Sequence, residues 1–235
     1  MARAHFILNH LEEAIAETRQ IHDGVVGRIR IGFATAAGSR ILPALLQKYR
    51  THCPRVEVWL GSILTDIQTQ MLLEGKLDFG FVRPPVISPK LTTMTVARAG
   101  MVVALRPGHP LLSRERLRLS DLADETFIGL AAGASDRLNE RVRLLCHDAG
   151  LRSDSGLHAA DSYAVLALVA AGCGVGILPE WISRTTQFQV QFRPLDDPSL
   201  TADIALVWCS DNASRAHEVF RELAETMKPT FSAAI

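Results

Sequence analysis

The feature that most constrains the fold of this chain is the alternation of short apolar runs and helical segments between Gly27 and Arg83. Three runs have the composition of strands, at residues 29–33, 56–60 and 77–82, and the two segments between them have helical apolar spacing. A helical crossover returns the chain to the same end of the sheet, so these strands are predicted to be parallel. Their carboxyl ends should therefore meet at one edge of the sheet.

That edge collects small and hydroxylated residues together with one permanent positive charge. Open parallel sheets bind small ligands beyond the strand ends, where helix N-termini present unpaired N–H groups. Arg83 directly follows the third strand, and its planar guanidinium can hold a carboxylate through two hydrogen bonds. We therefore predict half of a site for a small anion here. Its residues are Thr35, Ala36, Ala37, Ser62, Thr65 and Arg83.

Two of these residues also have a purely structural interpretation. Arg83 would then pair with an acidic side chain of a second lobe instead of a ligand. Thr65 would be an ordinary helix N-cap, and Gln68 follows it at the spacing of a capping box. The two roles of Thr65 are compatible, because a capping hydroxyl would lie at the crevice.

A second strand-and-helix pattern follows. Its strands are predicted at residues 101–105, 126–130, 155–159, 175–178 and 189–194, with helices from about 136 to 149 and from 161 to 171. The same strand-end argument adds Ala131, Ala132, Gly133 and Ser162 to the crevice. A strand at 202–209 and a helix over 216–227 are predicted to return to the first sheet. We expect an α/β protein of two Rossmann-like subdomains, 25–98 with 202–235 and 99–201, joined by two crossing strands.

An amphipathic helix is predicted before the first subdomain, within residues 1–24. Its apolar seam repeats at alternating spacings of four and three, as in helices that pair with another helix. The seam includes Leu8, Leu11 and Ile15, which we predict to form a dimer contact. Packing of this helix on its own domain is the alternative.

The charge balance and apolar pattern exclude several protein classes. The 235 residues contain 25 Lys and Arg and 25 Asp and Glu, so no sequence-wide attraction to nucleic acid or anionic membrane is expected. No apolar run approaches the ~20 residues that span a bilayer, and no export signal precedes the first helix, which predicts a cytoplasmic location. Four scattered cysteines form no C-x-x-C pair, so buried reduced thiols are expected.

Motifs for catalysis are missing from the sequence. There is no G-x-S-x-G elbow, no H-E-x-x-H and no P-loop, and the eight histidines lack metal-ligand spacing. The glycines of 172–176 follow a helix and precede a strand, the reverse of a dinucleotide-binding loop, so they predict a helix stop. We expect ligand binding without turnover, with no cofactor and no metal.

Several stretches together resemble the LysR-type transcriptional regulators, specifically their effector-binding region with its linker helix. They are Gly27–Phe33, Leu42–Pro43, Glu74–Pro85, His109–Leu111 and Leu168–Pro179, and the resemblance covers essentially the whole chain. It implies two subdomains of the type 2 periplasmic-binding-protein-like kind. In the subgroup that senses aromatic acids, an Arg at the place of Arg83 and a Thr at the place of Thr65 line the effector pocket. A hydroxyl residue often stands there where this chain has Ala36.

The resemblance also implies a mechanism. A small carboxylate metabolite, such as an aromatic acid, is expected to bind between the lobes and change their angle. The change passes to a winged helix-turn-helix domain that the family carries before the linker, outside this sequence, and promoter DNA binds only there. The subunits are expected to form a homo-oligomer, a dimer or a tetramer. The alternative is a solute-binding protein of a transport system, which shares the two-lobed architecture.

Overall fold

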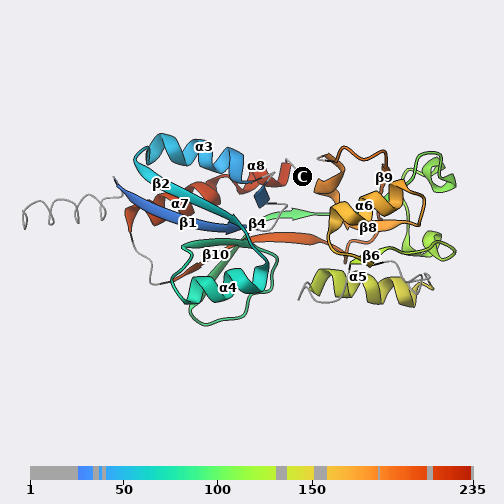
Figure 1. The fold of residues 1–235 in the computed structure, drawn as a ribbon, viewed down its shortest axis with the longest axis horizontal. Coiled ribbons are helices and arrows are strands. Elements are labelled where there is room, and N and C mark those ends of the chain that lie inside the picture. The colour runs from blue at the N-terminus through green and yellow to red at the C-terminus, as the bar shows by residue number, and fades with distance from the viewer. Residues whose placement is uncertain are drawn as a thin grey trace, which may run out of the picture. The chain divides into compact units, whose positions relative to one another are not determined.

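The computed structural model describes residues 26–33, 37–38, 41–130, 137–150, 158–184, 186–210 and 214–233 (Figure 1). The chain divides into two compact units. The first contains Met1–Val96 and Ile204–Ala234, and the second contains Ala97–Asp203. The predicted linker helix, with Leu8, Leu11 and Ile15, lies outside the described residues.

A five-stranded sheet of order β2-β1-β3-β10-β4 forms the framework of the first unit. The strands are β1 Gly27–Phe33, β2 Val56–Ser62, β3 Phe79–Val82, β4 Leu91–Ala99 and β10 Ala202–Cys209. β1 pairs in parallel with both β2 and β3, whereas β10 runs antiparallel to β3. The predicted parallel arrangement is confirmed: Phe33 is opposite Ser62 on one side and Phe81 on the other.

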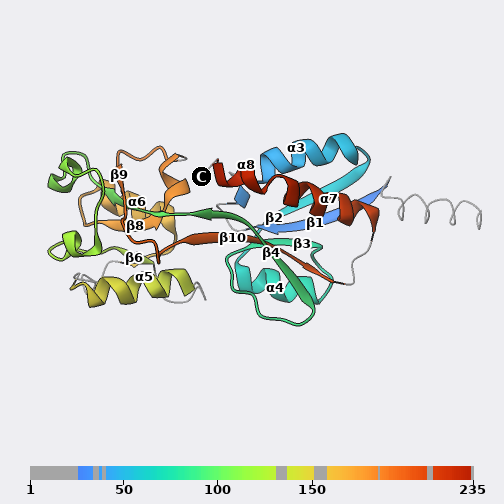
Figure 2. The same cartoon turned by 180° about the vertical axis from the view of Figure 1, so that it is seen from behind.

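One face of this sheet is covered by α3 Leu42–His52, α7 Arg215–Thr226 and α8 Lys228–Ala233 (Figures 1 and 2). α3 begins where Pro43 predicts, because a proline in the first turn costs no helical hydrogen bond. The rings of Tyr49, Phe79 and Phe81 lie 5.3, 4.5 and 6.4 Å from the ring of Phe220. This aromatic cluster forms the core between the sheet and α7.

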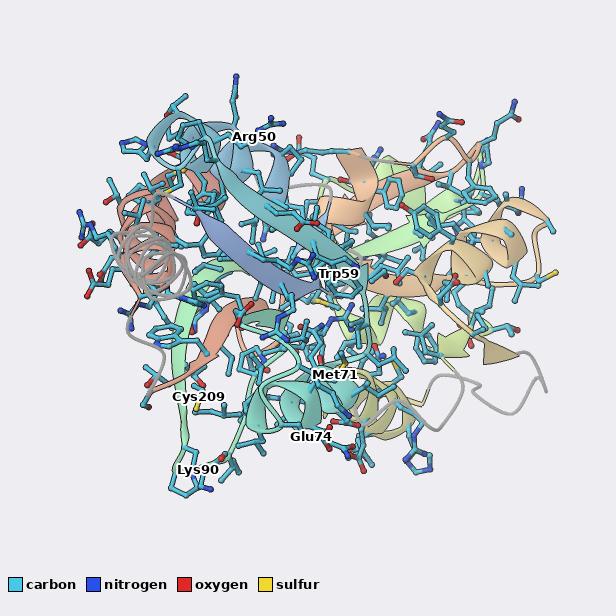
Figure 3. All side chains as sticks on the ribbon, turned by 60° about the vertical axis from the view of Figure 1, so that its left-hand side comes forward. Arg50, Trp59, Met71, Glu74, Lys90 and Cys209 are labelled. Carbon is cyan, nitrogen blue, oxygen red and sulfur yellow. The ribbon has the colours of Figure 1, made fainter. Side chains whose placement is uncertain are left out.

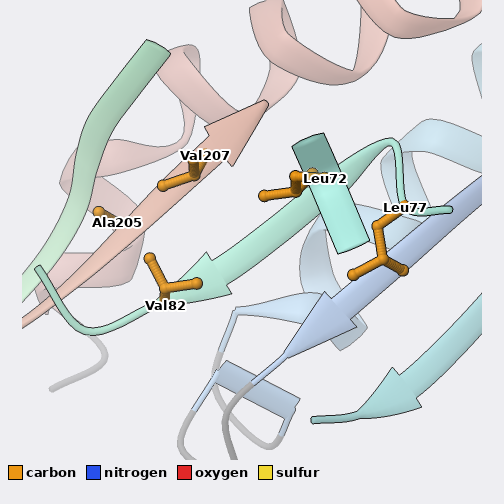
Figure 4. Packing of buried hydrophobic residues seen from close by; sticks show 5 residues of the cluster. All are labelled: Leu72, Leu77, Val82, Ala205 and Val207. Atoms are coloured by element: carbon orange, nitrogen blue, oxygen red, sulfur yellow. The ribbon is translucent and has the colours of Figure 1, made fainter. Parts of the chain in front are cut away.

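The other face is covered by α4 Thr65–Leu73. Side chains alternate along β3, so Val82 points to α4 while Phe79 and Phe81 face α7. Figure 4 shows the resulting apolar cluster, which consists of Leu72, Leu77, Val82, Ala205 and Val207. Both faces of the central strand β3 are therefore buried, as expected for a parallel strand with crossover helices.

The second unit is built around β5 Met101–Leu105, which pairs antiparallel with β8 Gly176–Pro179 and β9 Gln191–Pro194. A separate parallel pair is formed by β6 Gly129–Leu130 and β7 His158–Ala159. The helices are α5 Arg137–Asp148 and α6 Ser162–Ala170, with short 3₁₀ segments at Pro110–Ser113, Leu119–Leu122 and Glu180–Arg184.

Some predicted elements of the second unit are shorter than expected. Only Gly129–Leu130 of the strand predicted at 126–130 belongs to a ladder, since Phe127 makes an isolated bridge with Val175 instead. The helix stop after α6 is confirmed. Gly172 has φ +78°, the left-handed conformation that favours glycine, and its N–H donates to Val169 O at 2.9 Å.

The chain passes between the units within β4 and within β10. At this crossing Arg98 holds Asp203 through two hydrogen bonds of 2.8 Å, from Nε and Nη2. No helix in the described part of the chain has the length and apolar character needed to cross a membrane.

Candidate functional site

The carboxyl ends of β2 and β3 bring three of the predicted site residues together. Ser62 ends β2, Thr65 begins α4, and Arg83 directly follows β3. The Arg83 backbone N–H donates to Thr65 Oγ1 at 3.3 Å, which joins the two segments. The connecting loop is tied to β1, because Ile63 N donates to Phe33 O at 3.0 Å.

Thr65 does not have the capping role that its spacing to Gln68 predicts. The N-cap of α4 is Leu64, with φ −65° and ψ 148° and no side-chain capping bond, and Thr65 is the first helical residue. The capping-box prediction is wrong because both side chains have other partners. The Thr65 hydroxyl accepts from the Arg83 N–H, and the Gln68 carboxamide turns toward the sheet.

A surface hollow of about 230 Å³ lies beside Thr65, over the first turn of α4 and the loop after β3. It is lined by Thr65, Asp66, Thr69, Pro85, Val86 and Ile87. Asp66 is exposed and adds a negative charge to this lining, so the hollow itself disfavours an anion.

The structure gives less support for ligand contacts by the remaining predicted site residues. Ala37 is 1% exposed, so its side chain is not available to a ligand, and Thr35 and Ala36 lie outside the described residues. In the second unit, Ser162 is the first residue of α6, whose N-cap Asp161 accepts from Ala164 N through Oδ1 at 2.9 Å. Ala131, Ala132 and Gly133 also lie outside the described residues.

A buried charged cluster at the amino end of β3 was not predicted from the sequence. Asp78, 5% exposed, accepts hydrogen bonds from Arg30 N at 2.7 Å, Arg30 Nε at 3.1 Å and Arg30 Nη2 at 3.0 Å. His217 Nε2 lies 3.5 Å from Asp78 Oδ1, and His217 Nδ1 contacts the Ser214 hydroxyl. Burial raises the pKa of Asp78, but His217 and Arg30 outweigh it and lower that pKa to about 2.

This cluster lies at the amino end of β3, whereas Arg83 lies at its carboxyl end. The cluster therefore links β1, β3 and the start of α7 and does not face the predicted ligand. The signal that could have revealed it is an acidic residue directly before a buried strand. Its partners are distant in the chain, since Arg30 lies 48 residues earlier.

The described residues hold no candidate metal cluster, and their four cysteines are free thiols. No three His, Cys, Asp or Glu side chains among them lie close enough to hold a metal ion. Cys53 and Cys146 are buried free thiols, as predicted, but Cys173 and Cys209 are partly exposed, contrary to the expectation that all four are buried.

The family model described as "LysR substrate binding domain" matches residues 22–228. The chain belongs to this family. It is 30% identical over 218 residues to the HTH-type transcriptional regulator AlsR of Bacillus subtilis, covering 90% of this chain and 72% of AlsR. It is 27% identical over 200 residues to the HTH-type transcriptional regulator BenM of Acinetobacter baylyi, covering 84% of this chain and 66% of BenM.

Solved structures of the same family agree with this assignment. The BenM effector-binding domain with its effector benzoate matches with a TM-score of 0.78 at 25% identity, over 88% of this chain and 94% of that one. CbnR, a LysR family transcriptional regulator, matches with a TM-score of 0.76 at 22% identity, over 95% of this chain and 77% of that one.

The predicted family and the two-lobed α/β fold of the type 2 periplasmic-binding-protein-like kind are therefore confirmed. The chain is the effector-binding domain of a LysR-type transcriptional regulator and not an enzyme. The family assignment also decides against the solute-binding alternative.

Proposed function

We propose that this LysR-type domain senses a small carboxylate, which binds at the carboxyl edge of the first unit. The observation that carries the proposal is the bond from Arg83 N to Thr65 Oγ1. This bond places the backbone of Arg83, from which the guanidinium extends, next to the hydroxyl of Thr65. A hydroxyl that accepts one hydrogen bond can still donate its own proton, so Thr65 and Arg83 can hold one carboxylate together.

Helix electrostatics support the same ligand class. α4 is nine residues long and begins at Thr65, so its N-terminal N–H groups lie beside the proposed anion. Such an N-terminus contributes about 0.3–1 kcal/mol, and a sheltered hydrogen bond to a charged group about 1.5–3 kcal/mol. In the proposed site Ser62, Thr35 and the backbone N–H groups of Ala36 and Ala37 complete the first half, since the Ala37 side chain is buried. Ser162, Ala131, Ala132 and Gly133 supply the second half, with Ser162 at the start of α6.

The relatives suggest which carboxylates to test first. The BenM effector-binding domain is known with its effector benzoate, an aromatic carboxylate. Benzoate and substituted benzoates are therefore the first probes for this chain, followed by aliphatic mono- and dicarboxylates.

We further propose that the domain transmits binding to a winged helix-turn-helix domain before the linker and acts in the cytoplasm on promoter DNA. The full-length relative CbnR is known in complex with its target DNA. A homo-oligomer is proposed through Leu8, Leu11 and Ile15 of the linker. Exposed apolar residues support assembly as well. Trp59 of β2, labelled in Figure 3, is 45% exposed. Ile67 of α4 is 51% exposed.

A thermal-shift screen of carboxylates tests the proposal, followed by titration calorimetry of each ligand that raises the melting temperature. Arg83→Ala should weaken binding by about 10- to 150-fold, the equivalent of about 1.5–3 kcal/mol. Arg28→Ala is the matched control, because Arg28 lies at the amino end of β1 and pairs with Glu57 at 2.9 Å. An undiminished response in Arg83→Ala would contradict the proposed site.

A further inference from the structure

Gln68 is a fully buried polar side chain on α4, and neither the family assignment nor the proposed ligand contacts give it a role. Its exposed fraction is 0%, although it lies one turn from Thr65, at the start of the helix. A buried amide costs free energy unless its hydrogen bonds are made, so its partners need an explanation.

The Gln68 carboxamide bridges two chain segments. Nε2 donates to Ile63 O at 2.7 Å and to Phe81 O at 3.3 Å. Both neighbours are carbonyl acceptors, so the orientation of the amide group is fixed, because a flipped amide would face two acceptors with its oxygen. Oε1 has no hydrogen-bond donor within the described part of the chain.

Two glycines make room for this side chain. Gly32 and Gly80 are direct neighbours across β1 and β3. A Cβ on Gly80 would lie 2.8 Å from Gln68 Oε1, and a Cβ on Gly32 would lie 3.0 Å from both Gln68 Cγ and Oε1. The carboxamide therefore rests on the main chain of the sheet, with no side chain between.

Each bridged carbonyl belongs to a residue two positions before a proposed ligand contact. Ile63 precedes Thr65 in this way, and Phe81 precedes Arg83. The same two segments are also joined by the long bond from Arg83 N to Thr65 Oγ1, at 3.3 Å.

We propose that Gln68 is a positioning residue of the effector site, whose carboxamide fixes the spacing between Thr65 and Arg83. This inference rests on the proposed function for its consequence, since the spacing matters for a ligand held by both side chains. The apolar packing of α4 comes from other residues, such as Leu72 over β3 (Figure 4). Gln68 thus supplies directional bonds where an apolar side chain would supply packing alone.

The test compares Gln68→Met with Gln70→Met. Methionine keeps the length of the side chain but removes both donors. Gln70 is the matched control, because it is exposed on the same helix and donates to Glu74 Oε1 of that helix's C-terminal end, at 2.8 Å. Amide hydrogen exchange at Arg83 reports the bond to Thr65 directly, without a ligand. Benzoate affinity, measured by calorimetry, reports the consequence.

Gln68→Met should accelerate exchange of the Arg83 amide by about tenfold or more relative to amides of β5 in the second unit, and weaken benzoate binding by about tenfold. Gln70→Met should change neither quantity. Unchanged exchange at Arg83 in a folded Gln68→Met protein would overturn the proposal, whatever happens to the melting temperature. Wild-type protein that binds no carboxylate would count against the proposed function, while the exchange result would still decide the role of Gln68.

Gln68→Glu keeps the test decisive if Gln68→Met fails to fold. A protonated carboxyl can donate to one carbonyl, whereas an ionised carboxylate would face Ile63 O and Phe81 O with two acceptors. Exchange of the Arg83 amide, corrected for its intrinsic pH dependence, should therefore rise with pH in Gln68→Glu and not in wild type. A pH-independent ratio between the two proteins would contradict the positioning role.

Discussion

Replacing Asp78 with Asn should destabilise the first unit by about 2 kcal/mol near neutral pH. In the native protein the pKa of this carboxyl is about 2, against an ordinary value of 3.8. A depressed pKa stabilises the fold above the unfolded value, and the difference corresponds to about 2 kcal/mol. Asn cannot replace the carboxylate, because one end of its amide would point a donor at the N–H groups of Arg30.

The pH dependence gives the sign of the effect. The contribution of Asp78 is complete above about pH 4 and is lost as the pH falls through the native pKa of about 2. The difference in unfolding free energy between wild type and Asp78→Asn should therefore shrink to about half at pH 3. Urea unfolding followed by tryptophan fluorescence at pH 7 and pH 3 measures both values.

Glu57→Gln is the control for this prediction. Glu57 pairs with Arg28 on the same sheet, but both side chains are about two-thirds exposed. Its removal should cost less than about 0.5 kcal/mol, since exposed ion pairs contribute little. Equal losses in the two variants, or a difference from wild type that is the same at pH 7 and pH 3, would refute the reasoning.

Two further outcomes are expected. In a urea titration, Gly80→Ala should lower the unfolding free energy by about 1–3 kcal/mol, because its Cβ would lie 2.8 Å from Gln68 Oε1. Gly100→Ala should lower it clearly less, because a Cβ there would have no heavy atom nearer than 3.7 Å. Burial raises the pKa of the Cys146 thiol to about 12, so this thiol should not react with iodoacetamide at pH 8 in the native protein. Mass spectrometry should find Cys146 alkylated only in urea. Rapid labelling of the native protein would contradict this.

Elements defined by local spacing were predictable from the sequence. The parallel order of β1, β2 and β3 follows from the alternation of strands and helices. The first turn of α3 follows from Pro43, and the end of α6 from Gly172. In each case the physical cause acts between residues that are close in the sequence, so the sequence pattern alone predicts the element.

The interactions that organise the site were not predictable in this way. Gln68 follows Thr65 at a capping-box spacing, and its actual role depends on the space above Gly32 and Gly80 in other strands. The Asp78 cluster likewise joins Arg30 and His217 from distant parts of the chain. Such contacts depend on strand register, which periodicity alone does not provide.

The aromatic cluster around Phe220 has a consequence for biosynthesis. The second unit, Ala97–Asp203, is one continuous stretch, whereas the first combines residues from before and after it. The rings of Tyr49 and Phe79 find their partner only when α7 has been translated. During synthesis on the ribosome the second unit can therefore finish folding before α7 is available to complete the core of the first unit.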